Sequence, residues 1–240
     1  MSKKIVVVLS GGMDSAVLLH HHLRGKEEVR AITINYGQRH DIEVTHAQDL
    51  AQSLGVPWHC ANLNQLCHTL PGSSQTDSIC LVPEGHYAEE SMKLTVVPNR
   101  NMILLAIAIG HAIAHKFDFV SYGAHAGDHA IYPDCRPEFA EALNNVAGLC
   151  DWRPISLLRP FVHLTKAGIA KLGAEMNVDF RKTYSCYKGG RVHCGRCGTC
   201  VERLLAFEEA GVPDTTEYLD REFAHQIKQK PFPTTIENTI

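Results

Sequence analysis

A short apolar run near the start of the chain, residues 5–9, constrains the fold more than any other feature of the sequence. Its residues are β-branched or leucine and show no polar alternation, which is typical of a strand buried on both faces. The run stops at Ser10-Gly11-Gly12, and a helical pattern with an acidic first turn begins at Asp14. A chain that begins in this way is expected to form a parallel sheet with helices on both sides.

The same order of strand and helix recurs along the chain. Further strands are predicted at residues 29–34, 58–63, 117–122 and 155–160, and further helices at residues 42–54, 101–115, 137–149, 166–176 and 201–210. This alternation predicts an α/β fold with a doubly wound parallel sheet and right-handed crossovers. A length of 240 residues suits one such domain with an extension, or two small domains.

Composition and charge exclude several classes of protein. Apolar residues make up 45% of the chain and charged residues 20%, so a disordered chain is excluded. The net charge of −3 argues against a protein that binds nucleic acid by bulk electrostatics. No apolar run approaches the roughly 20 residues that span a bilayer, and residues 5–9 are too short for a signal peptide. The expected location is the cytoplasm.

Two segments lack a regular pattern. Residues 64–95 are interrupted by Pro71-Gly72 and by Pro83-Glu84-Gly85, and we expect them to be a functional lid or poorly ordered. The segment from Gln229 onward is rich in proline and threonine and is expected to be loose.

The string Ser10-Gly11-Gly12-Met13-Asp14-Ser15 has the composition of a phosphate-binding loop. Glycines let the backbone approach an anion closely, and the start of a helix offers unpaired N–H groups and a positive dipole end. Neither the mononucleotide pattern G-x-x-x-x-G-K-[ST] nor the dinucleotide pattern G-x-G-x-x-G occurs in the chain. The alternative is an ordinary glycine turn capped by Asp14.

Four of the nine cysteines lie within fifteen residues, in the pattern C-x7-C-x2-C-x2-C. They are Cys186, Cys194, Cys197 and Cys200. Four thiols at this spacing, with glycines between them, predict a closed tetrahedral Zn²⁺ site with a structural role. An iron–sulfur cluster and four unliganded thiols are the alternatives.

The glycine string resembles that of the PP-loop, or N-type, ATP pyrophosphatase family. Its members cleave ATP between the α and β phosphates and activate an oxygen of their substrate as an adenylate. The resemblance implies an adenine nucleotide alpha hydrolase-like fold. It also implies that the loop residues hold pyrophosphate and that Asp14 helps to place Mg²⁺. These residues are Ser10, Gly11, Gly12, Asp14 and Ser15.

Further strings narrow the resemblance to the 7-cyano-7-deazaguanine synthase family of the queuosine precursor pathway. They are the cysteine pattern and residues 36–40 (YGQRH), 97–101 (VPNRN), 132–139 (YPDCRPEF) and 160–169, which include Lys166. The resemblance covers about residues 4–210. It implies a ligase that adenylates 7-carboxy-7-deazaguanine with ATP and combines it with ammonia. The amide formed first is then dehydrated to the nitrile, and AMP and pyrophosphate are released.

The resemblance also suggests roles for single residues. Asp14, Arg100 and Lys166 would be catalytic, the two cations by binding phosphate charge, and Tyr36 would contact the adenine. Asp134 would accept hydrogen bonds from the guanine edge, and Arg136 would pair with the substrate carboxylate. Asp128 and His125 would complete the substrate site. For Asp134 and Arg136 the alternative is a turn held by an internal ion pair, and for Arg100 and Lys166 it is a solvated surface position. Cys135 is expected to be a small buried residue, since adenylation needs no thiol.

One loop departs from the family pattern. The family commonly has D-[FY]-S-G before Y-P-D-C-R, whereas this chain keeps Asp128 but continues His129-Ala130-Ile131. The reaction could therefore stop at the amide, or the activated acid could pass to an amine of a nucleic acid or protein. Other PP-loop enzymes, such as tRNA thiolases, would need a catalytic cysteine pair or a basic domain that we do not find. A zinc-binding interaction module would not explain the glycine string.

We divide the chain into a PP-loop ATP-binding domain (residues 1–180), a zinc-binding subdomain (181–212) and a C-terminal tail (213–240). The resemblance further implies a homodimer, whose partners are ATP, 7-carboxy-7-deazaguanine and ammonia. Neither a membrane nor stably bound nucleic acid is expected as a partner.

Overall fold

A computed structural model of the chain describes residues 2–87 and 90–228. Its strands form one parallel sheet in the order β3-β2-β1-β4-β5. They are β1 (Lys4–Val8), β2 (Glu28–Asn35), β3 (Trp58–Asn62), β4 (Phe119–Ser121) and β5 (Ser156–Leu158). The predicted fold class, a doubly wound parallel sheet, is confirmed.

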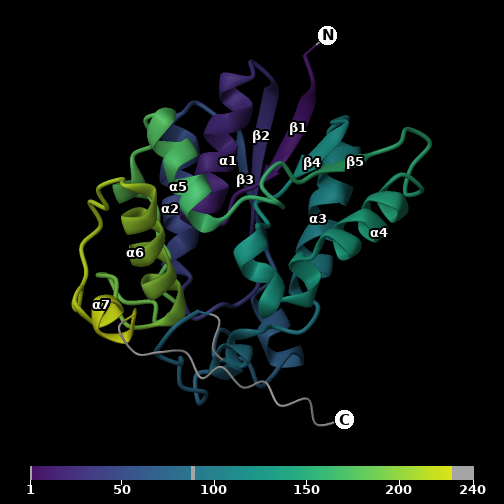
Figure 1. The fold of residues 1–240 in the computed structure, drawn as a ribbon. Helices are drawn as coiled ribbons and strands as arrows, with labels where there is room; N and C mark the ends of the chain where they lie inside the picture. Colours follow the sequence, from purple (N-terminus) through teal and green to yellow (C-terminus); the bar gives the residue numbers. More distant parts are fainter. Residues whose placement is uncertain (1, 88–89, 229–240) are drawn as a thin grey trace.

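Helices cover both faces of this sheet. They are α1 (Met13–Arg24), α2 (Ile42–Ser53), α3 (Arg100–Ala114), α4 (Pro137–Ala147), α5 (Lys166–Glu175) and α6 (Gly198–Ala210). A further helix, α7 (Phe223–Lys228), packs on α6. In Figure 1, α1, α2, α5 and α6 lie on one side of the sheet, and α3 and α4 lie on the other. No helix in the described part of the chain is long and apolar enough to cross a membrane.

The central strand β1 supplies side chains to two separate cores. Val6 packs with the buried residues of α3 and α4, whereas Ile5 and Val7 pack with those of α1, α2 and α5. All three side chains are fully buried. Alternate residues of a strand point to opposite faces, so a strand covered on both sides must be apolar at every position. This explains the continuous run on which the sequence prediction depends.

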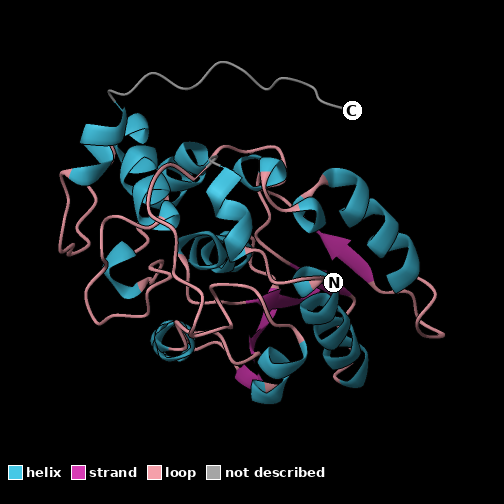
Figure 2. Ribbon diagram, turned by 90° about the horizontal axis from the view of Figure 1, so that it is seen from below, coloured by secondary structure: helices cyan, strands magenta, loops and turns pink. Residues whose placement is uncertain are grey.

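The strand order reverses between β1 and β4. From β1 the chain first builds β2 and β3 on one side, and then returns to build β4 and β5 on the other. In such sheets the crevice for a ligand lies at the carboxyl ends of the strands, at this point of reversal. That edge faces the viewer in Figure 2, where helices stand on both sides of the strands and long loops cross in front of them.

The segment 64–95 is more ordered than the sequence suggested. It contains two short 3₁₀ helices, η1 (Asn64–Thr69) and η2 (Glu90–Thr95). Ser73, Ser74 and Gln75 are fully buried, and the Gln75 carbonyl accepts a hydrogen bond from the Arg39 amide at 2.6 Å. Residues 88–89 lie outside the described ranges, as does the tail from Gln229 that we expected to be loose.

Helix α6 begins earlier than predicted, at Gly198 instead of residue 201, with Cys197 as its N-cap. Cys200 therefore lies in its first turn. The four cysteines pack around Val82 and Tyr184 as a third small core. Helix α7 was not predicted from the sequence, because its six residues are too few to show a period.

Candidate active site

The turn between β1 and α1 has a conformation that only glycine tolerates. Gly11 has φ +90°, and a Cβ there would lie 2.2 Å from the backbone oxygen of Glu43. Its carbonyl accepts a hydrogen bond from the Tyr184 amide at 2.9 Å. The turn is thus pressed between the start of α2 and the segment that leads into the cysteine cluster.

This turn leaves the N-terminus of α1 free to bind an anion. Gly12 is the N-cap of the helix and provides no side-chain cap. Asp14 does not cap it either, since its Oδ2 accepts a hydrogen bond from Lys166 Nζ at 2.6 Å. The hydroxyls of Ser10 and Ser15 lie 3.1 Å apart beside the turn. Unpaired N–H groups, a helix dipole and two hydroxyls form a suitable phosphate site.

A buried cluster of charged groups lies directly behind the turn. Lys166 Nζ lies 2.6 Å from Asp14 Oδ2, 3.4 Å from Glu202 Oε2 and 3.3 Å from His125 Nε2. His125 Nε2 lies 3.5 Å from Asp128 Oδ2, and His125 Nδ1 accepts from the Gly127 amide at 3.1 Å. The cluster joins α1, α5, α6 and the loop after β4, which lie far apart in the sequence.

Charge pairing sets the ionisation of this cluster. Burial raises the pKa of the Asp14 carboxyl, but the charges of Lys166 and His125 outweigh burial and hold that pKa below its usual range. Burial lowers the pKa of the Lys166 amine, yet Asp14, Glu202 and Asp128 together raise it well above its usual value. Asp14 is therefore a carboxylate and Lys166 a cation at neutral pH. The Asp14 Oδ1 atom is buried and has no hydrogen-bond partner among the described residues.

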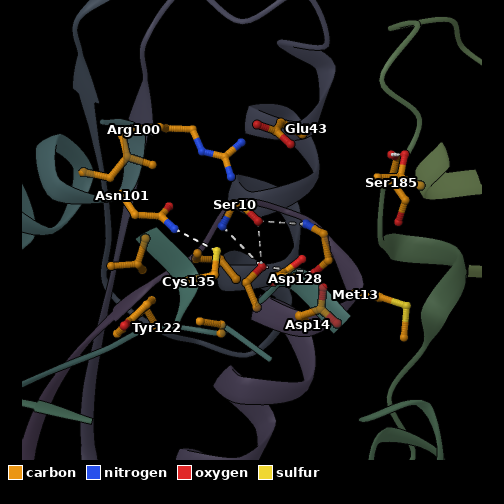
Figure 3. A pocket seen from close by; sticks show the side chains of 18 of the residues that line it. Ser10, Met13, Asp14, Glu43, Arg100, Asn101, Tyr122, Asp128, Cys135 and Ser185 are labelled. Atoms are coloured by element: carbon orange, nitrogen blue, oxygen red, sulfur yellow. Dashed lines mark hydrogen bonds between the residues drawn. The ribbon is translucent and has the colours of Figure 1, made fainter. Parts of the chain in front are cut away.

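Arg100 forms the opposite wall of the same pocket. It is the first residue of α3, and Asn99 before it adopts a left-handed conformation that asparagine tolerates. Arg100 Nη1 donates to Gln75 Oε1 at 3.3 Å, and the Arg100 guanidinium lies 5.7 Å from the ring centre of Tyr132. Tyr36 donates to the same Gln75 oxygen at 3.4 Å. In Figure 3 the guanidinium projects into the pocket above Ser10.

Glu43 and His40 also line this pocket. The sequence analysis gave neither residue a role, although His40 ends the string 36–40 on which the resemblance partly rests. Glu43 Oε1 accepts a hydrogen bond from Gln38 Nε2 at 2.9 Å, and Glu43 Oε2 lies 3.5 Å from His40 Nε2. Burial raises the pKa of the Glu43 carboxyl to about 8, against the lowering effects of Gln38 and Arg100. Their position after β2, at the carboxyl edge of the sheet, is the sequence signal that could have identified them.

The four clustered cysteines form a second candidate site. All four side chains are buried, and their Sγ atoms lie within 4.8 Å of one another. Cys194 Sγ and Cys200 Sγ are 3.9 Å apart, close to the edge of about 3.8 Å of a tetrahedron with 2.3 Å Zn–S bonds. The amide of Cys197 points to Cys194 Sγ at 3.2 Å, which suits a thiolate. This group can hold a metal ion.

Comparison with known proteins identifies the family. The model of the family described as queuosine biosynthesis protein QueC matches residues 4–211, which include both the pocket and the cysteine cluster. The chain belongs to the QueC family.

Curated relatives of this QueC-family chain are similar over nearly their whole length. The 7-cyano-7-deazaguanine synthase of Alteromonas mediterranea is 47% identical, over 91% of this chain and 100% of the relative. That of Brucella ovis is 48% identical, over 95% of this chain and 98% of the relative. Among solved structures, a 4-thiouridine synthetase in complex with RNA and ATP has a TM-score of 0.50 at 18% identity. The matched region covers 94% of this chain and 50% of the synthetase chain, and the similarity supports the fold alone.

The structure brings most of the predicted site residues of this QueC-family chain to one pocket. Those that line it are Ser10, Gly12, Asp14, Ser15, Tyr36, Arg100, Asp128 and Lys166. Gly11 does not line the pocket, but its positive φ gives the turn its conformation. His125 is buried and reaches the pocket residues through Lys166 and Asp128.

Asp134 and Arg136 do not line the pocket. Asp134 Oδ2 accepts a hydrogen bond from the Asn101 amide at 2.9 Å and so satisfies the start of α3. Arg136 Nε donates to the His129 carbonyl at 2.9 Å. Cys135, between them, does line the pocket, and burial raises the pKa of its thiol well above the usual value. A neutral thiol is a poor nucleophile, in agreement with its predicted role as a small buried residue.

Proposed function

We propose that this chain synthesises 7-cyano-7-deazaguanine from 7-carboxy-7-deazaguanine, ammonia and ATP, as a ligase that releases AMP and pyrophosphate. The observation that carries the proposal is the phosphate-binding turn, at the reversal point of the sheet, in a chain that matches named synthases along its length. No feature of the described residues or of these relatives favours an amine of a macromolecule as the acceptor, so we do not propose one.

In the proposed reaction, the turn binds the phosphates of ATP that leave as pyrophosphate. The first amides of α1 would bind this anion, and the hydroxyls of Ser10 and Ser15, which bond to each other and to the backbone of the turn, lie beside them as further donors. A carboxylate is a poor electrophile, and adenylation makes its oxygen a good leaving group. The enzyme must therefore hold ATP and the acid together and exclude water, which would hydrolyse the adenylate.

Asp14 fits the proposed role in placing Mg²⁺. Its carboxylate is ionised, and its buried Oδ1 has no hydrogen-bond partner within residues 2–87 and 90–228. A carboxylate oxygen is the hard ligand that Mg²⁺ prefers. Mg²⁺ bound with ATP would compensate the charge that develops as the phosphates separate. Lys166 holds the other oxygen of Asp14 in place and contributes a positive charge beside the turn.

The acid substrate is proposed to occupy the space between Arg100 and the loop after β4. Arg100 can bind the negative charge of the substrate carboxylate or of the α phosphate. Asp128 lines this space, with His125 behind it. Tyr36 remains the residue proposed to contact the adenine. The proposed guanine contact of Asp134 would require its carboxylate to leave the start of α3.

We propose that the four cysteines hold Zn²⁺ and that this site is structural. All four coordination positions come from the protein, so no position is left for a substrate. The proposed subdomain, residues 181–212, would then be stabilised by the metal. Residues 1–180 would form the ATP-binding domain and residues 213–240 the tail. We also propose a homodimer, located in the cytoplasm where ATP is supplied, with no stably bound nucleic acid.

The test is mass spectrometry of a reaction with 7-carboxy-7-deazaguanine, ATP, Mg²⁺ and ammonium. Formation of the nitrile with AMP and pyrophosphate is the expected result. Formation of the amide alone would show that the chain stops after the first adenylation. The absence of AMP would refute the proposed substrate.

A further inference from the structure

Three carboxyl groups line the pocket, and Glu43 differs from the other two in its partners. Asp14 is paired with Lys166 at 2.6 Å. Asp128 accepts a hydrogen bond from the Tyr87 hydroxyl at 3.1 Å and lies 3.5 Å from His125. Within the described ranges, no lysine or arginine nitrogen lies within 4.0 Å of the Glu43 carboxyl. Asp14 and Asp128 both act on the charge of Lys166, whereas Glu43 lies outside that charged cluster.

The partners of Glu43 leave acceptor capacity unused. Gln38 donates one amide hydrogen to Oε1, and the neutral ring of His40 lies 3.5 Å from Oε2. His40 is only 4% exposed, and its Nδ1 has no hydrogen-bond partner in the part of the chain that the structure describes. A buried polar atom without a partner is costly, which indicates that a small polar ligand completes this corner of the pocket.

The corner of the pocket between Glu43 and His40 lies close to where the reacting group would bind. In Figure 3 the guanidinium of Arg100 points toward Glu43, and Ser10 of the phosphate-binding turn lies below both. An acyl group bound by Arg100 and joined to the α phosphate, next to the pyrophosphate at the turn, would thus lie beside the Glu43 carboxyl. A nucleophile that attacks this acyl group from the corner would approach between Glu43 and His40.

We propose that Glu43 accepts the proton from the nitrogen nucleophile as the C–N bond forms. The inference rests on the proposed function. Ammonia adds to the acyl carbon of the adenylate, and the C–O bond to AMP breaks with its electron pair on the phosphate oxygen. The proton that the nitrogen must lose passes to the Glu43 carboxylate, giving the amide, AMP and a neutral Glu43. Glu43 returns that proton to water after AMP leaves.

The ionisation of Glu43 suits this role. Burial raises the pKa of its carboxyl to about 8, while Gln38 and Arg100 lower it and Asp41 raises it. The neighbouring His40, whose pKa burial lowers to about 3, cannot compete for the proton. General bases are most effective when their pKa lies near the working pH. Asp14, held as a carboxylate by Lys166, is a much weaker base.

The test compares two nucleophiles in wild type and in Glu43→Gln. The adduct of ammonia with the acyl carbon has a weakly acidic ammonium group, so its deprotonation needs a base. The adduct of hydroxylamine is more acidic and loses its proton to water. We expect Glu43→Gln to lower kcat/KM for ammonia at least about 100-fold, the lower end of the usual contribution of a general base. Hydroxamate formation and acid-dependent ATP–pyrophosphate exchange should each change less than about 3-fold. At constant free ammonia, the wild-type rate should rise to a plateau above pH 8, and that rise should be lost in the variant.

The exposed Asp49 on the same helix provides the control, since Asp49→Asn removes a carboxylate outside the pocket. An equal loss with both nucleophiles, a loss of pyrophosphate exchange, or unchanged ammonia kinetics in Glu43→Gln would each overturn the inference. The first two would show that Glu43 holds ATP or the acid. Absence of exchange in the wild type would instead refute the proposed function, and the inference with it.

Discussion

Gly11 is the residue at which the phosphate-binding turn tolerates the least change. Its positive φ disfavours any side chain, and a Cβ would overlap the Glu43 carbonyl. The Glu43 backbone cannot move away from an added Cβ as the end of a flexible side chain could. The short distance also keeps the start of α2, and thus the Glu43 side chain, next to the turn.

Gly11→Ala is expected to lower the free energy of unfolding by about 2 kcal/mol or more, from a strained φ and a backbone overlap together. ATP binding should be lost, because relief of the overlap moves the turn. Denaturant titration and calorimetric ATP binding measure the two effects. Gly55→Ala is the matched control, since Gly55 also has a positive φ of +66° but open space around it. Equal effects of both variants on ATP binding would contradict the argument.

The Glu43 carboxyl also couples the stability of the fold to pH. Its pKa is about 8 in the folded chain against a usual 4.5, so between these values only the folded chain holds this proton. The free energy of unfolding therefore falls as pH rises, by at most about 1.4 kcal/mol per pH unit. Below pH 6.5, His40 acts in the opposite direction, because burial lowers its pKa to about 3.

We expect Glu43→Gln to be less sensitive to pH than wild type between pH 6.5 and 8. Denaturant titrations at both pH values measure the difference in slope. Parallel slopes in the two proteins would show that Glu43 is not protonated in the folded chain.

Helix α6 connects the two candidate sites. Cys197 caps it and Cys200 lies in its first turn, while Glu202, two residues later, lies 3.4 Å from Lys166 in the pocket. Two turns after Cys200, the same helix buries Phe207 in the core that contains α1 and α5. A metal ion bound by the cysteines would therefore fix the position of the first turn of α6, and with it that of Glu202.

Cys200→Ser is expected to abolish binding of one metal ion per chain and to destabilise the α6 region, because binding energy of a structural metal is folding energy. Elemental analysis and thermal unfolding measure these effects, and a chelator should lower the wild-type Tm in the same way. Cys150→Ser, at an exposed thiol, should leave both unchanged. Full metal content in Cys200→Ser would contradict a four-cysteine site.

The pocket as a whole is built from residues that span most of the chain, from Val8 in β1 to Thr199 in α6. A ligand bound there contacts both helical layers and the segment that carries the cysteines. The ligand therefore stabilises the entire fold against unfolding, in addition to ordering its own loops.

ATP with Mg²⁺ is expected to raise the Tm in a concentration-dependent manner, corresponding to about 2.7 kcal/mol at 100 times its Kd. Differential scanning calorimetry measures this shift. Adenosine, which lacks the phosphates for the turn and for Asp14-bound Mg²⁺, should produce little of it. Equal stabilisation by adenosine would show that the turn contributes little to binding.

Local features of the chain were readable from sequence because their physical causes are local. The apolar run of β1 reports burial on both faces, and the glycine turn and the cysteine spacing are confined to a few neighbouring residues. The fold class and the family followed from these. Helix α7 and the buried segment around Gln75 gave no such signal, since their order depends on packing against distant residues.

The partners of each charged side chain, by contrast, depend on the topology of the sheet. The carboxyl edge brings Asp14, His125 and Lys166 together from three separate segments, and it places Glu43 opposite Arg100. Asp134 has the chemistry to read a guanine edge, yet it satisfies an amide at the start of α3. Residue type and spacing specify what a side chain can bind. The neighbouring groups that compete for a side chain set its pKa and its free acceptor atoms, and tertiary contacts bring those groups together, in the case of Asp14 and Lys166 from positions 152 residues apart.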